Sequence, residues 1–310
     1  MTLTKTERGF IRKSGRRLAA GCRALPVALS IALSVSVPVS VSGAWAAGLS
    51  GENPVEASGC PFRAAGEARV VDVVDGDTVV LDDGRQVRLV GIQAPKLPLG
   101  RKGFVAWPLA DEARGRLVRL AAGKRVTLYR GETGQDRHGR ELAQLVTQEE
   151  KPVWLQAEML RSGFARVYSF PDNRLCVDRL LAREKEARAR RAGIWALPFY
   201  AIRDAARVEE LGGLVDSFQL VEGKVKKAAL VRGRLYLNFG ERYQTDFTVT
   251  VPPRQVKLFA DREWADLLAD RDGEMPVVGK RLRVRGWIDR YNGPEIVVTH
   301  PEQVELLSAP

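Results

Sequence analysis

Apolar and polar residues alternate along much of the chain between residues 68 and 146, with the period of two that is typical of half-buried β-strands. Five short segments have this pattern: residues 70–74, 78–81, 86–90, 125–129 and 141–146. Three other segments repeat their apolar residues with helical spacing: residues 108–123, 152–161 and 175–192. A β-meander that precedes most of the helices predicts an α+β domain containing a small β-barrel.

A second β-rich region begins after Gly212 and Gly213, the clearest domain boundary in the sequence. Its predicted strands are residues 218–226, 235–239, 246–251, 281–288 and 295–306, with a helix at residues 261–268. Three strands, a helix and two more strands follow the order of an OB-fold. We therefore predict a linker at residues 198–213 and an OB-fold-like domain at residues 214–310.

Aromatic residues of this second region lie among basic ones: Tyr236, Phe239, Tyr243, Trp287 and Tyr291. If they are exposed together, their rings would form a platform on which nucleic-acid bases stack. The alternative is that most of them fill the interior of the barrel, because alternate strand residues must do so.

The first 47 residues differ from the rest of the chain. A basic stretch runs into an apolar, serine-rich segment at residues 25–41, which is followed by Ala44-Trp45-Ala46. This order is typical of a signal peptide, and it predicts cleavage near Ala46 and an exported protein, periplasmic or secreted. An uncleaved membrane anchor is the alternative, but Pro26 and Pro38 disfavour a spanning helix, so we expect no stable anchor after cleavage.

Removal of the signal peptide changes the charge of the protein. The complete chain has a net charge of +11, whereas the 42 basic and 37 acidic residues after residue 47 give +5. A mildly basic protein is compatible with a polyanionic partner, but net charge alone does not identify one.

Two cysteines remain after residue 47, Cys60 and Cys176. An oxidising compartment favours a disulfide between them, which would close a long loop. Two separate buried thiols are the alternative.

Several motifs occur in a specific order along the first region. Asp75-Gly76-Asp77-Thr78 precedes the sequence RLVGIQAPK at residues 88–96, and DRHGRELA follows at residues 136–143. With Tyr168 and Gly193-Ile194-Trp195, these pieces resemble the successive motifs of the thermonuclease (micrococcal nuclease-like) family. Each piece alone is weak, but several in order are specific.

The resemblance covers roughly residues 66–197 and implies an OB-type β-barrel with three helices. In active members of the family it implies calcium-dependent cleavage of phosphodiester bonds in DNA and RNA. We therefore predict a mainly β fold with α (α+β), in which a thermonuclease-like domain at residues 60–197 is followed by the second, OB-like β-barrel.

The resemblance also assigns roles to individual residues. Asp77 matches the first metal-binding aspartate of the family, and Ala94 matches a position whose backbone carbonyl reaches the metal. Arg88 and Arg140 match two arginines that grip the scissile phosphate. A guanidinium group suits this role because its paired N–H donors fit phosphate oxygens.

Two residues depart from the family pattern. Gln93 stands where active members have a second metal-binding aspartate, and Lys96 stands where they have the glutamate that activates the attacking water. Calcium gains affinity from carboxylate ligands, so a neutral amide and a nearby ammonium group would weaken its site. A protonated lysine has no lone pair with which to accept a proton.

Three hypotheses follow from this combination of residues. We favour a binding module that keeps phosphate recognition through Arg88 and Arg140, with Lys96 as a further candidate, but has lost metal-assisted hydrolysis. The second is a nuclease with a rearranged site that uses Asp75, Asp77 or another acid such as Glu112 or Asp136. The third is an envelope scaffold. The partner is accordingly nucleic acid or another polyanion, calcium is a doubtful cofactor, and catalytic activity and oligomeric state stay open.

Overall fold

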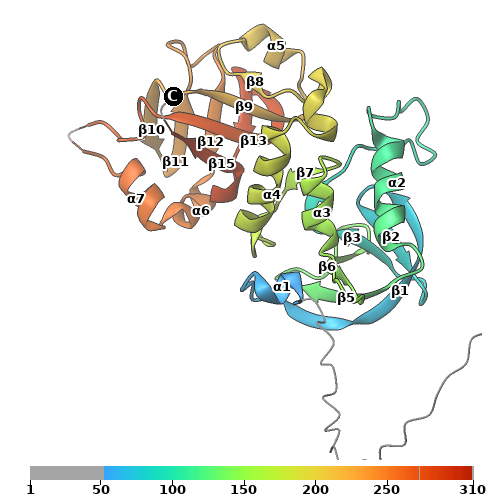
Figure 1. Cartoon of the computed structure of the whole chain (residues 1–310). Coiled ribbons are helices and arrows are strands. Elements are labelled where there is room, and N and C mark those ends of the chain that lie inside the picture. The colour runs from blue at the N-terminus through green and yellow to red at the C-terminus, as the bar shows by residue number, and fades with distance from the viewer. Residues whose placement is uncertain (1–51, 272, 309–310) are drawn as a thin grey trace, which may run out of the picture. The chain divides into compact units, whose positions relative to one another are not determined.

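The computed structural model describes residues 52–271 and 273–308 (Figure 1). The predicted signal peptide at residues 1–47 lies outside the described residues, so it stays a prediction. In the described part of the chain, no helix is long and apolar enough to cross a membrane.

Within residues 52–271, five strands form a closed barrel in the order β1-β2-β3-β6-β5. They are β1 (Arg63–Asp75), β2 (Thr78–Leu81), β3 (Gln86–Leu89), β5 (Arg125–Arg130) and β6 (Glu141–Thr147). β1 pairs with both β2 and β5, and shifts in its register bend it far enough to close the sheet. β3 and β6 are parallel. The predicted OB-type barrel is confirmed.

The three predicted helices are also confirmed, with shorter bounds. They are α2 (Ala110–Ala121), α3 (Leu155–Arg161) and α4 (Val177–Ala189), and a short α1 (Pro54–Ala57) precedes the barrel. In α2, Asp111 and Glu112 lie in the first turn, where negative charge stabilises the helix dipole. The buried face of α2 includes Ala113 and Leu117, and it packs against β1.

A small antiparallel sheet that the sequence did not predict joins β4 (Gly91–Gln93) to β7 (Arg166–Tyr168). Gly91 makes this sheet possible because its φ is 86°, and a Cβ atom there would lie 2.7 Å from a methyl group of Leu180. The chain can therefore leave β3 and turn directly into β4. Register places Gln93 opposite Arg166.

The C-terminal domain, as far as the described residues show it, is an eight-stranded sheet in the order β10-β11-β12-β14-β13-β9-β8, with β15 also paired to β13. The strands are β8 (Arg203–Asp204), β9 (Phe218–Lys224), β10 (Lys227–Val231), β11 (Arg234–Asn238), β12 (Thr248–Val251), β13 (Arg281–Tyr291), β14 (Gly293–Val297) and β15 (Val304–Leu307). The helices are α5 (Val208–Gly212), α6 (Pro253–Val256) and α7 (Arg262–Leu268). Part of the predicted linker thus belongs to this sheet as β8.

The chain itself connects the two sides of this sheet, because only Val225 and Lys226 separate β9 from β10. Val225 N–H donates to Lys280 O beside β13 (2.9 Å), and Lys226 N–H donates to Asn238 O of β11 (2.8 Å). Counted as one broken strand, β9 and β10 give the strand order of an OB-like barrel, with β12 and β14 parallel. β10 was not predicted from the sequence because nearly all of its residues are exposed.

A buried ion pair joins the C-terminal domain to α4. Arg285, only 1% exposed, donates from Nη1 to Glu184 Oε2 (2.9 Å) and from Nη2 to Glu184 Oε1 (3.0 Å). Glu184 also accepts the backbone N–H of Val167 in β7 (2.5 Å). Burial alone would lower the pKa of Arg285, but the charges of Glu184 and Glu305 outweigh it and raise that pKa. The contact therefore fixes β13 beside β7.

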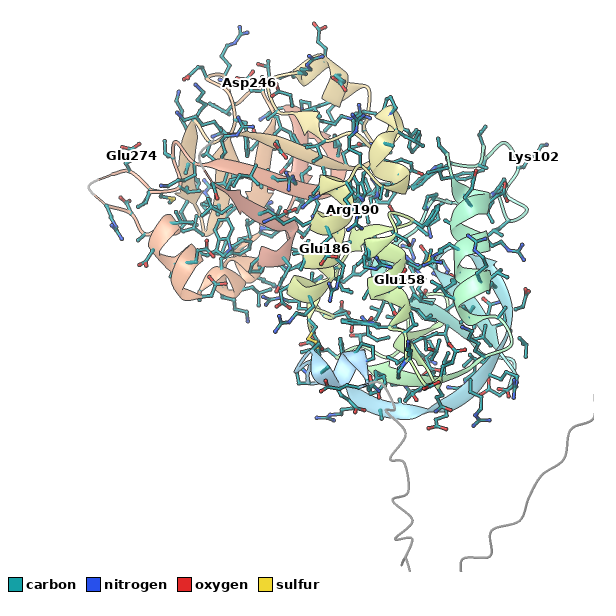
Figure 2. The ribbon with its side chains drawn as sticks, in the orientation of Figure 1. Lys102, Glu158, Glu186, Arg190, Asp246 and Glu274 are labelled. Atoms are coloured by element: carbon teal, nitrogen blue, oxygen red, sulfur yellow. A yellow bond between two sulfur atoms is a disulfide. The ribbon has the colours of Figure 1, made fainter. Side chains whose placement is uncertain are left out.

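A disulfide joins Cys60, just before β1, to Cys176, at the start of α4 (Figure 2). Their Cα atoms are 5.8 Å apart, within the range of an ordinary disulfide. The predicted pairing is confirmed. The bond spans 116 residues, so it closes a loop that contains the whole barrel.

We expect the paired substitution Cys60→Ser with Cys176→Ser to lower the free energy of unfolding by about 2–4 kcal/mol, because the open chain regains the entropy of a long loop. Urea unfolding with and without reductant measures this loss. Reductant should destabilise the native protein by a similar amount and leave the variant unchanged. Equal stability of native and variant proteins under oxidising conditions would contradict the prediction.

Candidate functional site

A cleft of about 920 Å³ lies against β3, β4 and β7, and residues of the C-terminal domain line its other side. The predicted site residues that line it are Arg88, Gln93, Lys96 and Arg140. Asp77 and Ala94 are buried next to them, 0% and 1% exposed. The fold thus brings together the candidates that the sequence placed far apart.

The turn between β1 and β2 positions Asp77. Its backbone N–H donates to Asp75 Oδ1 (3.0 Å), which fixes the turn. Gly76 is required between them, because a Cβ atom there would lie 2.6 Å from the Cβ of Ala94. The loop after β4 can therefore pack directly on the turn and bring Lys96 to Asp77.

The carboxylate of Asp77 binds two cations. Lys96 Nζ lies 2.9 Å from Oδ1 and 2.7 Å from Oδ2, and Arg88 Nη1 forms an ion pair with Oδ1. The backbone N–H of Ala94 donates to Oδ2 (2.7 Å). Lys96 also lies 3.7 Å from Asp75 Oδ2. Two carboxylates and two cations thus share one largely buried cluster.

The pKa values reflect this balance of charge. Burial would raise the pKa of Asp77, but the charges of Arg88 and Lys96, with hydrogen bonds from Lys96 and the backbone N–H of Ala94, hold it well below its usual value. Burial raises the pKa of Asp75, and the nearby negative charge of Asp77 adds to this effect. Burial lowers the pKa of Lys96, while the charge of Asp77 opposes this shift. Asp77 is therefore the fixed negative charge around which the cluster forms.

Much of the Arg88 guanidinium group is bound by other groups of the protein. Besides its ion pair with Asp77, its Nη1 donates to Asp77 O (3.2 Å) and its Nη2 to Ile92 O (2.8 Å). Its side chain is 11% exposed. Arg88 therefore ties the turn before β2 to β4 and presents only part of its guanidinium group to the cleft.

Arg140 lies across the cleft at the end of a tight turn. Its Nε donates to Asp136 Oδ2 (2.8 Å), and its Nη2 lies 2.7 Å from the same oxygen. Asp136 Oδ1 accepts the backbone N–H groups of His138 (2.8 Å) and Arg140 (3.0 Å). The neighbouring Arg137 is exposed and also lines the cleft. Of the other acids considered from the sequence, Asp75 and Asp136 line the cleft, whereas Glu112 does not.

Gln93 binds an arginine that was not predicted as a site residue. Its Oε1 accepts hydrogen bonds from Nε (3.0 Å) and Nη2 (2.8 Å) of Arg166. Arg166 is 5% exposed, its guanidinium lies 4.6 Å from the ring of Phe218, and burial lowers its pKa to about 10. Only the β4–β7 pairing, a contact distant in sequence, brings Arg166 to this position.

The residues at Asp77 do not fit a calcium ion as they lie in this structure. Both carboxylate oxygens of Asp77 already bind the Lys96 ammonium, and the side-chain oxygen of Gln93 binds Arg166. A cation placed there would meet three positive side chains at close range. Among the described residues, no group of three or more His, Cys, Asp and Glu side chains is placed to hold a metal.

Exposed aromatic residues line the same cleft. Trp287, from β13, is 47% exposed, and its Nε1–H donates to the hydroxyl of Tyr168 (3.0 Å), which holds the indole in place. Phe170 and Phe199 are 44% and 47% exposed and also line the cleft. Trp287 was a stacking candidate from the sequence, but its position beside the arginines of the first domain was not predicted.

We expect Asp77→Asn to destabilise the protein by about 3–5 kcal/mol at pH 7, because it leaves Arg88 and Lys96 buried without their main partner. The folded-state pKa of Asp77 lies below its unfolded value, so its contribution is complete above about pH 4 and is lost as the pH falls further. Urea unfolding at pH 7 and below pH 4 should therefore show the difference between native and variant proteins shrinking with acid.

The matched control for this prediction is Asp83→Asn, which removes an exposed partner of Arg85 and should change stability little at either pH. Asp75 is present in all three proteins, but the charge of Asp77 contributes to its raised pKa, so Asp77→Asn also changes the titration of Asp75. Equal stability of Asp77→Asn and Asp83→Asn at pH 7 would show that the cluster does not stabilise the fold.

Comparison with known proteins supports the family resemblance of the first domain. The family described as staphylococcal nuclease homologue matches residues 86–197. The Thermonuclease of Staphylococcus hyicus is 28% identical over an alignment of 151 residues, which covers 44% of this chain and 83% of that protein. Protein ParB of Escherichia coli is 33% identical over 147 residues, covering 44% of this chain and 77% of that protein.

An uncharacterized endonuclease of Escherichia coli O157:H7 is 33% identical over 131 residues, which cover 41% of this chain and 76% of that protein. The family match lies within the first domain, which contains the closed barrel, the ordered motifs and much of the cleft. The chain therefore belongs to the family of staphylococcal nuclease homologues.

Proposed function

We propose that this protein is an exported, nucleic-acid-binding member of its family that lacks calcium-dependent nuclease activity. One observation carries the proposal: the ammonium group of Lys96 binds both carboxylate oxygens of Asp77, the residue that would hold the metal. The same lysine stands where a water-activating glutamate is expected. A single residue thus replaces both the ion and the base.

The chemistry of Lys96 opposes hydrolysis in a second way. A general base needs a lone pair near the attacking water, and a lysine offers one only after losing its proton. Burial lowers the pKa of Lys96, but the ion pair with Asp77 favours the protonated form. Loss of that proton would leave the buried Asp77 with Arg88 as its remaining cationic partner.

The cleft supports binding of single-stranded nucleic acid. Arg137 and Arg140 provide guanidinium groups for phosphates, and Trp287, Phe170 and Phe199 present exposed rings on which unpaired bases can stack. The named relatives include a thermonuclease and an endonuclease, which are proteins that act on nucleic acid.

The proposed export rests on the signal-peptide pattern of the first 47 residues. The disulfide between Cys60 and Cys176 supports it, because such bonds persist in oxidising compartments.

We expect no calcium-stimulated cleavage of DNA by the native protein. The double substitution Gln93→Asp with Lys96→Glu should create a calcium site, because it replaces a cation and an amide with carboxylates. Calcium should then raise the melting temperature of the double variant by about 2–4 °C for each kcal/mol by which calcium binding stabilises the folded state. Thermal unfolding and a DNA cleavage assay, each with calcium or with chelator, measure the two effects.

Arg166 would pair with the carboxylate introduced at position 93 and so compete with calcium for it. We therefore expect the double variant to show calcium binding more clearly than DNA cleavage. Gln93→Asp alone should show neither effect. If the native protein cleaves DNA with calcium and Asp77→Ala abolishes that activity, the site is a rearranged nuclease, with Asp75 as the additional acid in the cleft.

We also expect the mature protein to bind single-stranded DNA or RNA weakly, with an affinity that falls steeply as salt increases. Trp287→Ala should lower the affinity at least about fivefold, because it removes a ring on which a base stacks. Arg137→Ala with Arg140→Ala should lower it further and reduce the salt slope by about 1 for each phosphate that the variant no longer binds. Fluorescence anisotropy with a labelled oligonucleotide at several salt concentrations provides the measurement.

Arg183→Ala is the matched control for the binding prediction, since Arg183 is an exposed arginine on α4 that pairs with Glu186 outside the cleft. It should retain native affinity. No binding at low salt, or an equal loss of affinity in all variants, would favour the scaffold hypothesis.

A further inference from the structure

The outer face of the C-terminal sheet has an unusual composition across β11, β12 and β14. Register pairs Asn238 with Thr248, Tyr236 with Thr250, and Thr248 with Glu295. Residues paired in this way lie on the same face of a sheet. The alternate positions, such as Leu237 and Val249, belong to the hydrophobic core. Polar groups and a tyrosine therefore cover the opposite, outer face.

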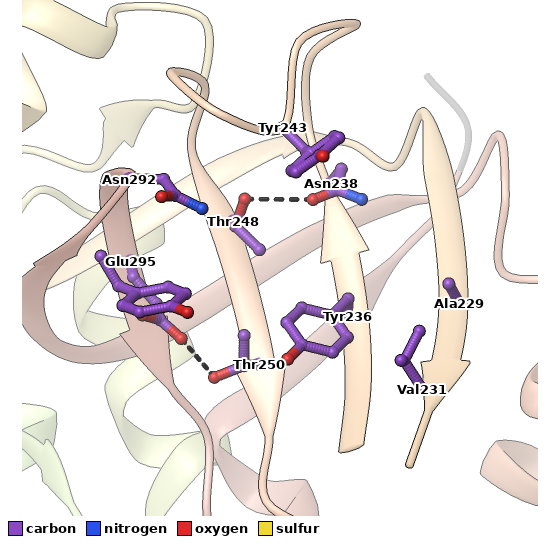
Figure 3. A pocket seen from close by; sticks show the side chains of 10 residues that line it. Ala229, Val231, Tyr236, Asn238, Tyr243, Thr248, Thr250, Asn292 and Glu295 are labelled. Atoms are coloured by element: carbon purple, nitrogen blue, oxygen red, sulfur yellow. Dashed lines mark hydrogen bonds between the residues drawn. The ribbon is translucent and has the colours of Figure 1, made fainter. Parts of the chain in front are cut away.

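This outer face encloses a hollow of about 350 Å³ (Figure 3). Tyr236 forms one wall, and Tyr243 and Tyr291 contribute two further rings that are 58% and 67% exposed. The floor is polar and buried, with Thr250 and Glu295 only 2% and 6% exposed although they lie on the outer face of the sheet. The hollow thus combines three aromatic rings with a sequestered carboxylate.

The floor leaves the carboxylate of Glu295 without a cation. Thr250 Oγ1 donates to Glu295 Oε1 (2.5 Å), and Thr248 Oγ1 donates separately to Asn238 Oδ1 (3.1 Å); both bonds are drawn in Figure 3. Arg234 reaches only the hydroxyl of Thr250, at 3.4 Å. Among the described residues, Glu295 forms no ion pair within 4.0 Å. A buried carboxylate with one neutral donor is poorly compensated.

The carboxylate of Glu295 and the tyrosine rings of the hollow favour a positively charged ligand over a negatively charged one. Its lining contains no lysine or arginine in the described part of the chain, so a phosphate or carboxylate would meet Glu295 with Arg234, beside Thr250, as the nearby cation. A cation would gain both from the carboxylate and from the negative faces of the tyrosine rings. The volume suits a small head group instead of a folded segment.

We propose that this hollow binds an alkylammonium group, with Glu295 as its counter-ion and Tyr236, Tyr243 and Tyr291 as an aromatic enclosure. Such a group can belong to a free polyamine or to a lysine side chain. The proposal concerns a site separate from the arginine-lined cleft, and it does not depend on the function proposed for that cleft.

Isothermal titration calorimetry of the mature protein tests this site with spermidine and with N-acetyl-lysine amide. The neutral analogue N-acetyl-norleucine amide and the mononucleotide dCMP serve as comparison ligands. We expect the ammonium ligands to bind and the neutral analogue to bind at least tenfold more weakly. Tighter binding of spermidine than of the lysine amide identifies a free polyamine as the ligand, and the reverse order identifies a lysine side chain.

Glu295→Gln should weaken ammonium binding at least tenfold while keeping the hydrogen bond from Thr250, because the amide oxygen still accepts it. Tyr291→Ala, at an exposed position that does not endanger the fold, should weaken binding several-fold. Glu209→Gln, an exposed acid on α5, is the matched control and should bind as the native protein does.

Three results would overturn the proposal. The first is the absence of ammonium binding at millimolar concentration, and the second is unchanged affinity in both Glu295→Gln and Tyr291→Ala. The third is binding of dCMP that is abolished in Tyr291→Ala but kept in Glu295→Gln, which would assign the hollow to a nucleobase.

Discussion

The need to neutralise the buried carboxylate of Asp77 organises the site. A carboxylate removed from water costs several kcal/mol unless cations and hydrogen bonds replace its hydration. Here Lys96, Arg88 and the backbone N–H of Ala94 do so together. Because Arg88 also holds Ile92 O, the same interaction fixes where β4 leaves the barrel. The cluster therefore stabilises the local fold as well as determining the chemistry of the cleft.

A second set of interactions shapes the cleft through β7. On one side, Arg166 of β7 binds Gln93 and lies over Phe218 of the C-terminal domain. On the other, the backbone N–H of Val167 binds Glu184, which also holds Arg285. These bonds bring β13 alongside β7, and Trp287 of β13 reaches Tyr168. The aromatic wall of the cleft is thus a consequence of how the two domains are joined.

Local patterns in the sequence predicted the barrel strands and the three helices, because the spacing of apolar residues is encoded locally, and the disulfide was predicted because two cysteines remain after residue 47. They did not predict the β4–β7 pairing or Arg166, since both depend on interactions between distant residues. The five aromatic residues considered as one platform are divided by the fold. Phe239 lies in the core, Trp287 in the cleft, and the three tyrosines around the hollow. Alternation along a strand indicates which face a residue occupies, but not what covers that face.

Some of the motif residues explain how the fold is held together, and others indicate whether the site can catalyse hydrolysis. Asp77 and Arg88 match the motifs that the sequence resembles, yet each makes hydrogen bonds that hold the turn and β4 in place, so their presence is explained without hydrolysis. Gln93 and Lys96 depart from the pattern expected from that resemblance, and both bind charged partners instead of leaving oxygens free for a metal. Gln93 and Lys96 therefore say more about the chemistry of the site than Asp77 and Arg88 do. In this chain the buried aspartate finds its positive charges in Lys96 and Arg88, and these contacts hold the turn and the loop after β4 together.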